Sequence, residues 1–282
     1  MTLICDCGAT KAEWVVLDGN NVAQRFITNG FNPNFTENAT MNGIIEEVKN
    51  SIDNQDVNEI FFYGSGCGGD ANQVRVKMIF NKVFPNSKSE IYPDTLAACH
   101  ALFGRNAGVA CILGTGSNAC FYDGEIITKS VASLGFMIGD EGSGCHIGKR
   151  IVHDYFLGLM PDDLRKKFDE KYHLNRESFL KKVYQGEQPS KYLAEFSKFA
   201  SENNDDQYVK SLVNNCFEAF ISSFRLEQSG MEKSQTVAFV GSIAFAFQEI
   251  LTQVLDNHHI KCEKIMKNPM DGLIEYYQGV IA

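Results

Sequence analysis

Residues 8–19 read GATKAEWVVLDG, and residues 114–124 read GTGSNACFYDG. Both stretches begin with a loop of glycine and hydroxyl-bearing residues, continue as an apolar segment of strand length, and end at an Asp-Gly pair, which is a hairpin-turn signal. Three short strands are predicted around each stretch, so the pattern starts twice along the chain. The repetition predicts an α/β fold of two duplicated domains that face each other across a cleft, where small ligands commonly bind.

Short runs of β-branched and aromatic residues and the helical spacing of apolar residues predict the individual elements. Strands are predicted at 3–7, 13–17, 22–28, 59–63 and 90–92, with helices at 42–52, 71–84 and 94–102. Further strands are predicted at 109–113, 119–122, 126–131 and 236–240, with a helical tract at 144–226 broken near Pro161 and Pro189, a helix at 242–255 and a last helix after Pro269. We expect domains at 1–105 and 106–282, the second with a helical insertion, and the last helix packing back on the N-terminal domain.

The composition excludes several classes of protein. A formal net charge of −9 argues against a nucleic-acid partner, because such binding depends on clustered Lys and Arg. No apolar run reaches the ~18 residues of a membrane span, and the first residues lack the basic segment of a signal peptide. The nine cysteines are odd in number and include no CxxC pair, so we expect reduced thiols in a cytoplasmic protein.

Two loops are candidates for binding phosphate. In the first, Asp6 ends a buried strand and could hold Mg²⁺, while Gly8, Thr10 and Lys11 would border a phosphate. In the second, residues 113–118, two glycines and two hydroxyls between strands suit the close approach of anionic oxygens. Each loop is also compatible with an ordinary hairpin turn, in which glycine relieves backbone strain.

Residues 64–69, GSGCGG, match the GxGxxG pattern of dinucleotide-binding proteins. The match follows a strand and precedes a helix, as a nicotinamide or flavin enzyme requires. That fingerprint usually follows the first strand of its fold, however, whereas this strand is the fourth. No Walker A loop is present in the sequence.

Five further residues, at three places in the chain, are candidate ligand contacts. Asp94 precedes an alanine-rich helix, so it is either the helix N-cap or a base that accepts a proton from a substrate hydroxyl. Asp140 and Glu141 are adjacent carboxylates between glycines, where they could cap a helix or bind the hydroxyls of a polyol. Gly241 and Ser242 lie between a strand and a helix and could receive an adenosine or form a plain turn. The six histidines have no metal-binding spacing, so none is assigned to a metal.

Five segments together resemble the N-acetylglucosamine kinase-like group of proteins. They are, in chain order, DCGATKAEW, IYPDTLAACHAL, ILGTGSNACFYDG, IGDEGSGCHIG and FVGSIAFAFQEIL, and they span nearly the whole chain. This group shares a superfamily with the ATPase subunits of benzoyl-CoA reductase and the activators of 2-hydroxyacyl-CoA dehydratases. The resemblance implies two ribonuclease H-like domains of the actin-like ATPase fold, with ATP and Mg²⁺ as the cofactors.

The resemblance also implies roles for individual residues. Asp6 looks like the residue near the metal, Asp94 looks like the catalytic base, and Asn32 looks like the sugar-binding asparagine. The implied phosphate contacts are Gly8, Thr10, Lys11, Gly114, Thr115, Gly116 and Ser117. The other implied sugar contacts are Thr115, Asp140, Glu141 and Asp94 itself, and the implied adenosine contacts are Gly241 and Ser242.

Two positions depart from the pattern of that group. Cys7 stands where the first loop usually has glycine. Leu134-Gly135-Phe136 replaces the tryptophan-glycine pair before GDEG, so we expect the wall of the sugar pocket to differ. No cysteine pair is placed to hold the iron–sulfur cluster of the activator ATPases, which favours the kinase branch.

The sequence therefore predicts an ATP-dependent kinase that acts on N-acetylglucosamine or a close amino sugar. Asp94 would deprotonate the acceptor hydroxyl, Mg²⁺ held through Asp6 and water would bridge the phosphates, and domain closure would exclude water. The alternatives are an ATPase that drives a conformational change in a partner protein, a non-catalytic sugar or nucleotide sensor, and the dinucleotide enzyme. The oligomeric state stays open, although kinases of this kind are often dimers, so a homodimer is one expectation.

Overall fold

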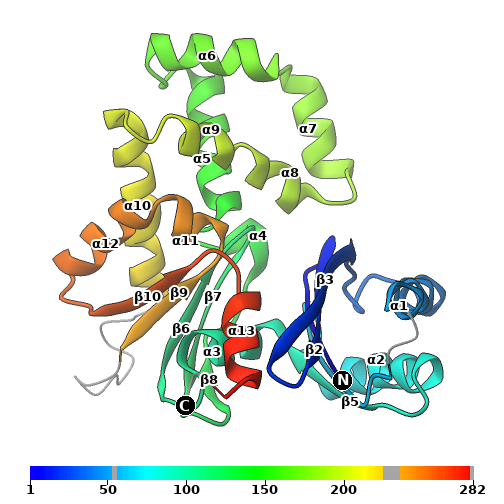
Figure 1. The fold of residues 1–282 in the computed structure, drawn as a ribbon. Helices are drawn as coiled ribbons and strands as arrows, with labels where there is room; N and C mark the ends of the chain where they lie inside the picture. Colours follow the sequence, from blue (N-terminus) through cyan, green and yellow to red (C-terminus); the bar gives the residue numbers. More distant parts are fainter. Residues whose placement is uncertain (53–55, 225–235, 280–282) are drawn as a thin grey trace. The chain divides into compact units, whose positions relative to one another are not determined.

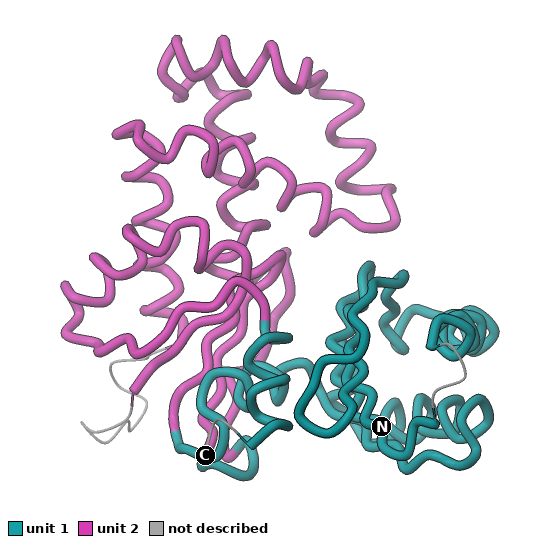
Figure 2. Tube along the Cα trace, in the orientation of Figure 1, with its two compact units in different colours: residues 1–107, 123–127, 269–282 teal, residues 108–122, 128–268 magenta. Residues whose placement is uncertain are grey.

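The computed structural model describes residues 1–52, 56–224 and 236–279. The chain divides into two compact units (Figure 2). Unit 1 comprises residues 1–107, 123–127 and 269–282, and unit 2 comprises residues 108–122 and 128–268. Each unit contains a five-stranded mixed sheet with flanking helices, so the predicted α/β fold with two sheets is confirmed.

The sheet of unit 1 has the strand order β3-β2-β1-β4-β5. Its strands β2, β3 and β5 are labelled in Figure 1. β1 pairs antiparallel with β2 and parallel with β4, and β4 pairs parallel with β5. Antiparallel neighbours can be joined by a tight hairpin, whereas parallel neighbours need a longer crossover, which in this sheet contains a helix. The elements are β1 (Thr2–Cys7), β2 (Lys11–Asp18), β3 (Asn21–Asn29), α1 (Asn38–Ser51), β4 (Glu59–Gly64), α2 (Asp70–Val83), β5 (Lys88–Pro93), α3 (Asp94–Phe103) and α13 (Met270–Tyr277).

Apolar side chains cover both faces of this sheet. On one face, Trp14 and Phe80 belong to a buried cluster that includes residues of α1 and α2. On the other face, Ile4 belongs to a second cluster with residues of α3 and with Met270 of α13. Successive strand residues point to opposite faces, so a strand buried on both faces is apolar at nearly every position. The acidic Asp6 is therefore an exception within β1.

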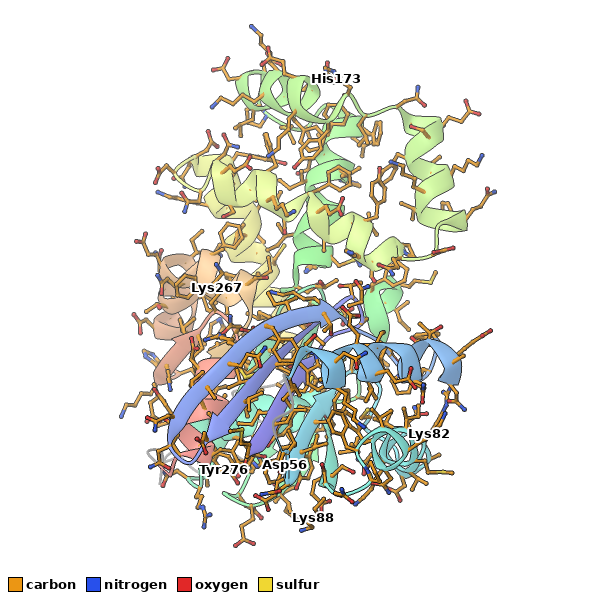
Figure 3. The ribbon with its side chains drawn as sticks, turned by 45° about the vertical axis from the view of Figure 1, so that its right-hand side comes forward. Asp56, Lys82, Lys88, His173, Lys267 and Tyr276 are labelled. Carbon is orange, nitrogen blue, oxygen red and sulfur yellow. The ribbon has the colours of Figure 1, made fainter. Side chains whose placement is uncertain are left out.

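Aromatic side chains tie α13 to the rest of unit 1. The hydroxyl of Tyr63 lies 2.7 Å from His100 Nδ1 and 2.7 Å from the hydroxyl of Tyr277. The rings of His100 and Tyr276 stack with their centroids 4.2 Å apart (Tyr276 is labelled in Figure 3). Burial lowers the pKa of His100 to about 4, so its imidazole is neutral at physiological pH. These contacts fix α3, which begins at Asp94.

The sheet of unit 2 repeats the order of the first, as β8-β7-β6-β9-β10. β6 pairs antiparallel with β7 and parallel with β9, as β1 does with β2 and β4, and β10 pairs parallel with β9. The duplication predicted from the two glycine-containing stretches is therefore confirmed. The strands are β6 (Gly108–Leu113), β7 (Ser117–Tyr122), β8 (Ile127–Ser130), β9 (Val237–Val240) and β10 (Cys262–Met266).

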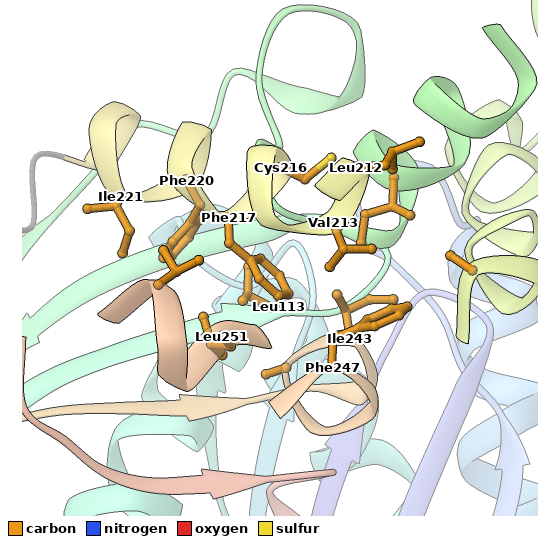
Figure 4. Close-up of a cluster of buried hydrophobic side chains, with 14 of the residues drawn as sticks. Leu113, Leu212, Val213, Cys216, Phe217, Phe220, Ile221, Ile243, Phe247 and Leu251 are labelled. Carbon is orange, nitrogen blue, oxygen red and sulfur yellow. The ribbon is translucent and has the colours of Figure 1, made fainter. Parts of the chain in front are cut away.

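The helices of unit 2 share one large hydrophobic core. Figure 4 shows Phe217 and Phe220 of α10 near Leu251 of α12 and Leu113 at the end of β6. Burial of Leu113 fixes the point at which the following loop leaves the sheet. The helices are α4 (Gly135–Ile138), α5 (Gly144–Leu157), α6 (Asp162–Tyr172), α7 (Arg176–Gln185), α8 (Pro189–Glu195), α9 (Ser197–Glu202), α10 (Gln207–Phe224), α11 (Ser242–Ala246) and α12 (Gln248–Asn257).

Several elements differ from the predictions. The predicted helix at 242–255 is two helices, because Phe247, with φ −118°, interrupts the helical backbone between α11 and α12. β10 is absent from the predictions, because it is a partly exposed edge strand whose sequence, CEKIM, alternates charged and apolar residues only weakly. The N-cap of α3 is Pro93 rather than Asp94, which is the first helical residue. The last two residues of the predicted helical tract at 144–226, residues 225 and 226, lie outside the described residues.

Among the described helices, none combines the length and the apolar character that a membrane crossing requires. All nine cysteines are described, and none of them forms a disulfide bond; eight are buried and Cys262 is partly buried.

Candidate active site

The first phosphate-loop candidate is the turn between β1 and β2. The Gly8 N–H donates to Lys11 O at 3.0 Å, which closes a tight turn. Thr10 and Lys11 are exposed on this turn, and within the described residues their side chains make no hydrogen bond or ion pair. A hydroxyl and an ammonium group are thus available to an anionic ligand.

Two carboxylates lie at the carboxyl end of the unit 1 sheet. In the register of the parallel strands, Cys7 pairs with Gly64, and Gly64 pairs with Pro93. Asp6 and Asp94 therefore lie at the same edge of the sheet, on either side of β4. The carboxyl ends of parallel strands are common places for ligands to bind.

The pKa values of both carboxylates are raised. Burial, followed by the charge of Asp94, raises the pKa of Asp6 from 3.8 to about 7. Burial also raises the pKa of Asp94, although hydrogen bonds from the N–H groups of Thr95 and Asp94 and from the Ser65 hydroxyl oppose the shift. A carboxylate with a raised pKa can accept a proton near neutral pH, and two close carboxylates attract a divalent cation.

The residues present fit a magnesium ion that keeps most of its water. Within the described part of the chain, no group of three or more acidic, histidine or cysteine side chains could hold a metal ion. Mg²⁺ is commonly held by one or two carboxylates together with water and substrate phosphates. Asp6 and Asp94 supply that number of carboxylates. The pKa of Asp6 is raised by burial and then by the charge of Asp94, and a bound cation would offset both effects.

Asn32 lies in residues 30–36, which we call the acceptor loop, and this loop packs against the GxGxxG segment. A Cβ atom on Gly66, whose φ is +78°, would lie 2.2 Å from Asn32 Oδ1. Asn72 Nδ2 donates to Asn34 Oδ1 at 2.7 Å and to Gly66 O at 2.9 Å. The close approach of Asn32 thus requires glycine at position 66, which gives part of the GxGxxG pattern a structural reason independent of any dinucleotide.

Cys7 and Gly30 join the acceptor loop to the first phosphate turn. The Phe31 N–H donates to Cys7 Sγ at 3.4 Å, and the thiol lies 3.6 Å from Phe31 O, to which it can donate. A Cβ atom on Gly30 would lie 2.0 Å from Gly8 O, so the two backbones are in direct contact. The departure from glycine at position 7 therefore supplies a thiol that holds the acceptor loop.

The second phosphate-loop candidate, residues 114–117, connects β6 to β7 in unit 2. The Gly114 N–H donates to Gly116 O at 3.0 Å, and a Cβ atom on Gly114 would meet no other heavy atom within 4 Å. Ser117 Oγ is buried and has no hydrogen-bond partner among the described residues. A buried hydroxyl is usually paired, so this orphaned group and the open space at Gly114 fit an anionic oxygen bound at the loop.

The GDEG turn packs on this second loop. The Ser117 N–H donates to Asp140 Oδ1 at 3.3 Å, and Asp140 has a left-handed φ of 59°. Burial raises the pKa of Asp140, while the Ser117 N–H and the charge of Lys149 oppose the shift. The Gly144 N–H, at the start of α5, donates to Gly114 O at 2.8 Å. The turn and the loop thus form one connected structure.

The segment that departs from the group pattern just before GDEG forms the single-turn helix α4. Lys149 Nζ donates to Phe136 O, which ties α4 to α5. Met137 and Ile138 are exposed apolar side chains of this helix. Glu141 is partly exposed and makes no hydrogen bond or ion pair within the described residues, so its carboxylate is available to a ligand.

A cavity of about 320 Å³ in unit 2 adjoins the second loop. Its lining includes Ile243 and Ala246 of α11 and Phe247, which follows that helix. It also includes the charged residues Lys191, Glu195 and Lys198. An apolar surface with a few polar groups is typical of a site for a small molecule with an aromatic base. The lining residues are Gly114, Thr115, Gly144, Lys191, Ala194, Glu195, Ser197, Lys198, Ser201, Ser242, Ile243, Ala246 and Phe247.

Gly241 allows β9 to approach the second loop closely. Its φ is +133°, and a Cβ atom there would lie 2.2 Å from Leu113 O. Only glycine fits this backbone conformation and this contact. Ser242, the next residue, is the first residue of α11 and lines the cavity.

Sequence reasoning does not find the three charged residues of the cavity wall. Lys191, Glu195 and Lys198 are exposed on α8 and α9, helices of the insertion that lie far along the chain from the glycine loops. Charges three and four residues apart are typical of any solvated helix face. No local signal therefore separates these three from other surface charges.

The structure brings the candidate residues together in two groups, each within its own unit. The group in unit 1 consists of Asp6, Gly8, Thr10, Lys11, Asn32 and Asp94. The group in unit 2 consists of Gly114, Thr115, Gly116, Ser117, Asp140, Glu141, Gly241 and Ser242.

Two sheets of matching topology, each with a glycine-containing turn after its central strand, define the class of two-domain actin-like ATPases. Within that class, the chain belongs to the BadF/BadG/BcrA/BcrD ATPase family, whose profile matches residues 5–275. The resemblance found in the sequence is therefore confirmed. No curated protein matches the chain significantly.

Solved structures give the same result. A protein from Porphyromonas gingivalis, provisionally named an N-acetylglucosamine kinase, is 33% identical, with a TM-score of 0.94 over 99% of each chain. A protein of the same provisional name from Chromobacterium violaceum is 12% identical, with a TM-score of 0.72 over 98% of each chain. The ROK hexokinase from Thermus thermophilus is 11% identical, with a TM-score of 0.52 over 98% of this chain and 96% of its own. The last two share the fold alone.

Proposed function

We propose that this protein is an ATP-dependent kinase that transfers a phosphoryl group to a hydroxyl of N-acetylglucosamine or a close amino sugar. The single observation that carries the proposal is the pair of carboxylates at the carboxyl edge of the unit 1 sheet, Asp6 and Asp94, with raised pKa values. A carboxylate at this edge could accept a proton from a sugar hydroxyl or from water, and the sugar dependence of turnover distinguishes the kinase from the ATPase. The P. gingivalis relative, by its provisional name, supports the choice of sugar.

The nucleotide would be held mainly by unit 2. The apolar residues Ile243 and Phe247 suit the adenine ring, and the cavity that they line adjoins the glycine loop at Gly114. Lys191 and Lys198 would compensate the charge of the phosphates, and Glu195 could accept hydrogen bonds from ribose hydroxyls. The Ser117 hydroxyl, which has no hydrogen-bond partner in the described part of the chain, would gain a phosphate oxygen as its partner.

The acceptor sugar would be held by Asn32, with Asp94 as the general base. Asp94 would take the proton of the attacking hydroxyl as the phosphoryl group arrives. Bound Mg²⁺, held through Asp6 and water, would neutralise charge on the phosphates. Thr10 and Lys11, on the exposed turn, are proposed as further phosphate contacts. Thr115, Asp140 and Glu141 are proposed as further sugar contacts.

An ATPase that drives a change in a partner protein is the main rival, because the family is an ATPase family. The activators in its superfamily use cysteines to hold an iron–sulfur cluster. Eight of the nine thiols of this chain are buried and the ninth is partly buried, so none is freely exposed to share such a cluster with another chain. The thiols therefore support the kinase rather than the activator.

A coupled assay of ADP formation tests the proposal. Purified protein with Mg²⁺ and ATP is tested with no sugar, with glucose, with glucosamine and galactosamine, and with their N-acetyl forms. We expect ADP formation to depend on an N-acetyl sugar and to be lost in Asp94→Asn. Turnover that is indifferent to every sugar would favour the partner-coupled ATPase, and binding without turnover would favour the sensor.

A further inference from the structure

Arg75 holds the acceptor loop through all three nitrogens of its guanidinium group. Nε donates to Asn38 Oδ1 at 2.5 Å, Nη2 donates to Thr36 O at 2.8 Å, and Nη1 donates to Pro33 O. Arg75 lies on α2, whereas two of these acceptors are backbone carbonyls of the acceptor loop and the third belongs to the first residue of α1. A rigid planar fork that bonds two points of one loop fixes the course of that loop.

The loop so fixed gives the Asn32 amide one orientation. The Asn34 N–H donates to Asn32 Oδ1 at 2.9 Å, so the oxygen of the amide must face the loop. The Asn32 carbonyl accepts from the Phe35 and Thr36 N–H groups, each at 2.9 Å. Asn32 Nδ2 makes no hydrogen bond within the described residues, and it is the group left to face a ligand. Asn32 therefore presents donors and no acceptor.

We propose that Arg75 is a positioning residue for the acceptor sugar, which it affects by holding the loop that orients Asn32. The inference rests on the proposed function, because it takes Asn32 as a sugar contact. It also specifies the chemistry of the sugar group opposite Asn32, which must accept a hydrogen bond. A hydroxyl or an acetyl carbonyl oxygen can accept, whereas the ammonium of a free amino sugar cannot.

Phe35 supports a ligand at this loop. Its side chain is 88% exposed, although it is a large aromatic residue, and it lies three residues after Asn32. Aromatic rings offer an apolar surface to the C–H faces of a bound molecule. The loop thus combines a fixed donor and an exposed apolar ring.

The test compares steady-state kinetics and melting temperatures of the full-length wild type, Arg75→Lys, Asn72→Ala and Lys77→Gln. Arg75→Lys keeps the charge but loses the fork, and Asn72→Ala removes the bonds to Asn34 and Gly66. Lys77→Gln is the matched control, because Lys77 is on the same helix and pairs with Glu90, away from the acceptor loop. Displacing a substrate-binding group by about 1 Å can reduce rates by about 100-fold.

For Arg75→Lys we expect the KM of the sugar to rise about tenfold or more, with the KM of ATP changed less than about twofold. Asn72→Ala should also raise the KM of the sugar. If Arg75→Lys does not fold, the Asn72→Ala variant provides the test. Unchanged sugar KM values in the folded variants would overturn the inference. So would equal rises in both KM values together with a fall in melting temperature, which a purely structural role would give. A wild type without sugar-dependent turnover refutes the proposed function first, and the inference falls with it.

Discussion

Asp6→Asn is expected to stabilise the protein above pH 7 in the absence of metal, although Asp6 belongs to the proposed metal site. The pKa of Asp6 is raised from 3.8 to about 7, first by burial and then by the charge of Asp94. A group whose pKa is raised on folding contributes stability that is complete below pH 3.8 and is lost as the pH rises through about 7. At 1.36 kcal/mol per pKa unit, a rise from 3.8 to about 7 means that the buried, charged form of Asp6 reduces the free energy of unfolding by up to about 4 kcal/mol. Asn carries no charge and avoids this cost.

Guanidinium unfolding at pH 4, 6 and 8 in the presence of EDTA measures the effect. The Asp6→Asn variant and the wild type should be equally stable at pH 4, and the variant should become more stable at pH 8, by up to about 4 kcal/mol. Asp18→Asn is the matched control, because Asp18 is exposed at the end of β2 in the same sheet, and it should stay within about 0.5 kcal/mol. Mg²⁺ at pH 8 should stabilise the wild type more than the variant. The reasoning would be refuted if the variant were no more stable than the wild type at pH 8. It would also be refuted if the variant exceeded the wild type in stability by the same amount at pH 4 as at pH 8.

Three further predictions concern single positions. Asp94→Asn should abolish phosphoryl transfer while ATP affinity, measured by calorimetry, stays within about threefold; an active variant would show that Asp94 is not the base. Gly241→Ala should weaken ATP binding more than about tenfold, because the new Cβ would lie 2.2 Å from Leu113 O. The control Gly43→Ala should leave ATP binding unchanged, because a Cβ at position 43 faces open space. Normal ATP binding by Gly241→Ala would contradict the proposed pocket. The wild type should lose up to about 3 kcal/mol of stability through His100 as the pH falls from 6.5 to about 4, because the folded state holds this imidazole neutral. The His100→Gln variant should not lose this stability between pH 6.5 and about 4. If the free energy of unfolding falls equally with pH in the variant and the wild type, His100 is not the cause.

Much of the fold is predictable from the sequence because its signals are local. The strands of unit 1 are short apolar runs, and the same pattern of three strands with a glycine-containing turn occurs twice along the chain. The sequence therefore predicts the duplicated sheets. β10 and α4 escape prediction because an edge strand and a single exposed turn bury too few apolar residues to leave a pattern. The predicted N-cap of α3 is wrong by one residue, since both Pro93 and Asp94 are common at helix starts.

The candidate site is only partly predictable, because some of its contacts join distant parts of the chain. The reason for glycine at position 66 is the side chain of Asn32, which a local pattern cannot reveal. Cys7 is a simple departure from glycine in the sequence, yet its thiol bonds the Phe31 backbone 24 residues away. Arg75 is one more charge on a helix in the sequence, and its role depends on three acceptors 37 to 42 residues earlier in the chain.

The fate of the γ-phosphate of ATP tests the central claim most directly. Protein is incubated with Mg²⁺, N-acetylglucosamine and ATP labelled in the γ-phosphate, and the products are separated. We expect the label on the sugar in amounts equal to the ADP formed, and on no product with Asp94→Asn. Label that appears only as inorganic phosphate, at a rate unaffected by the sugar, would contradict the proposed kinase activity.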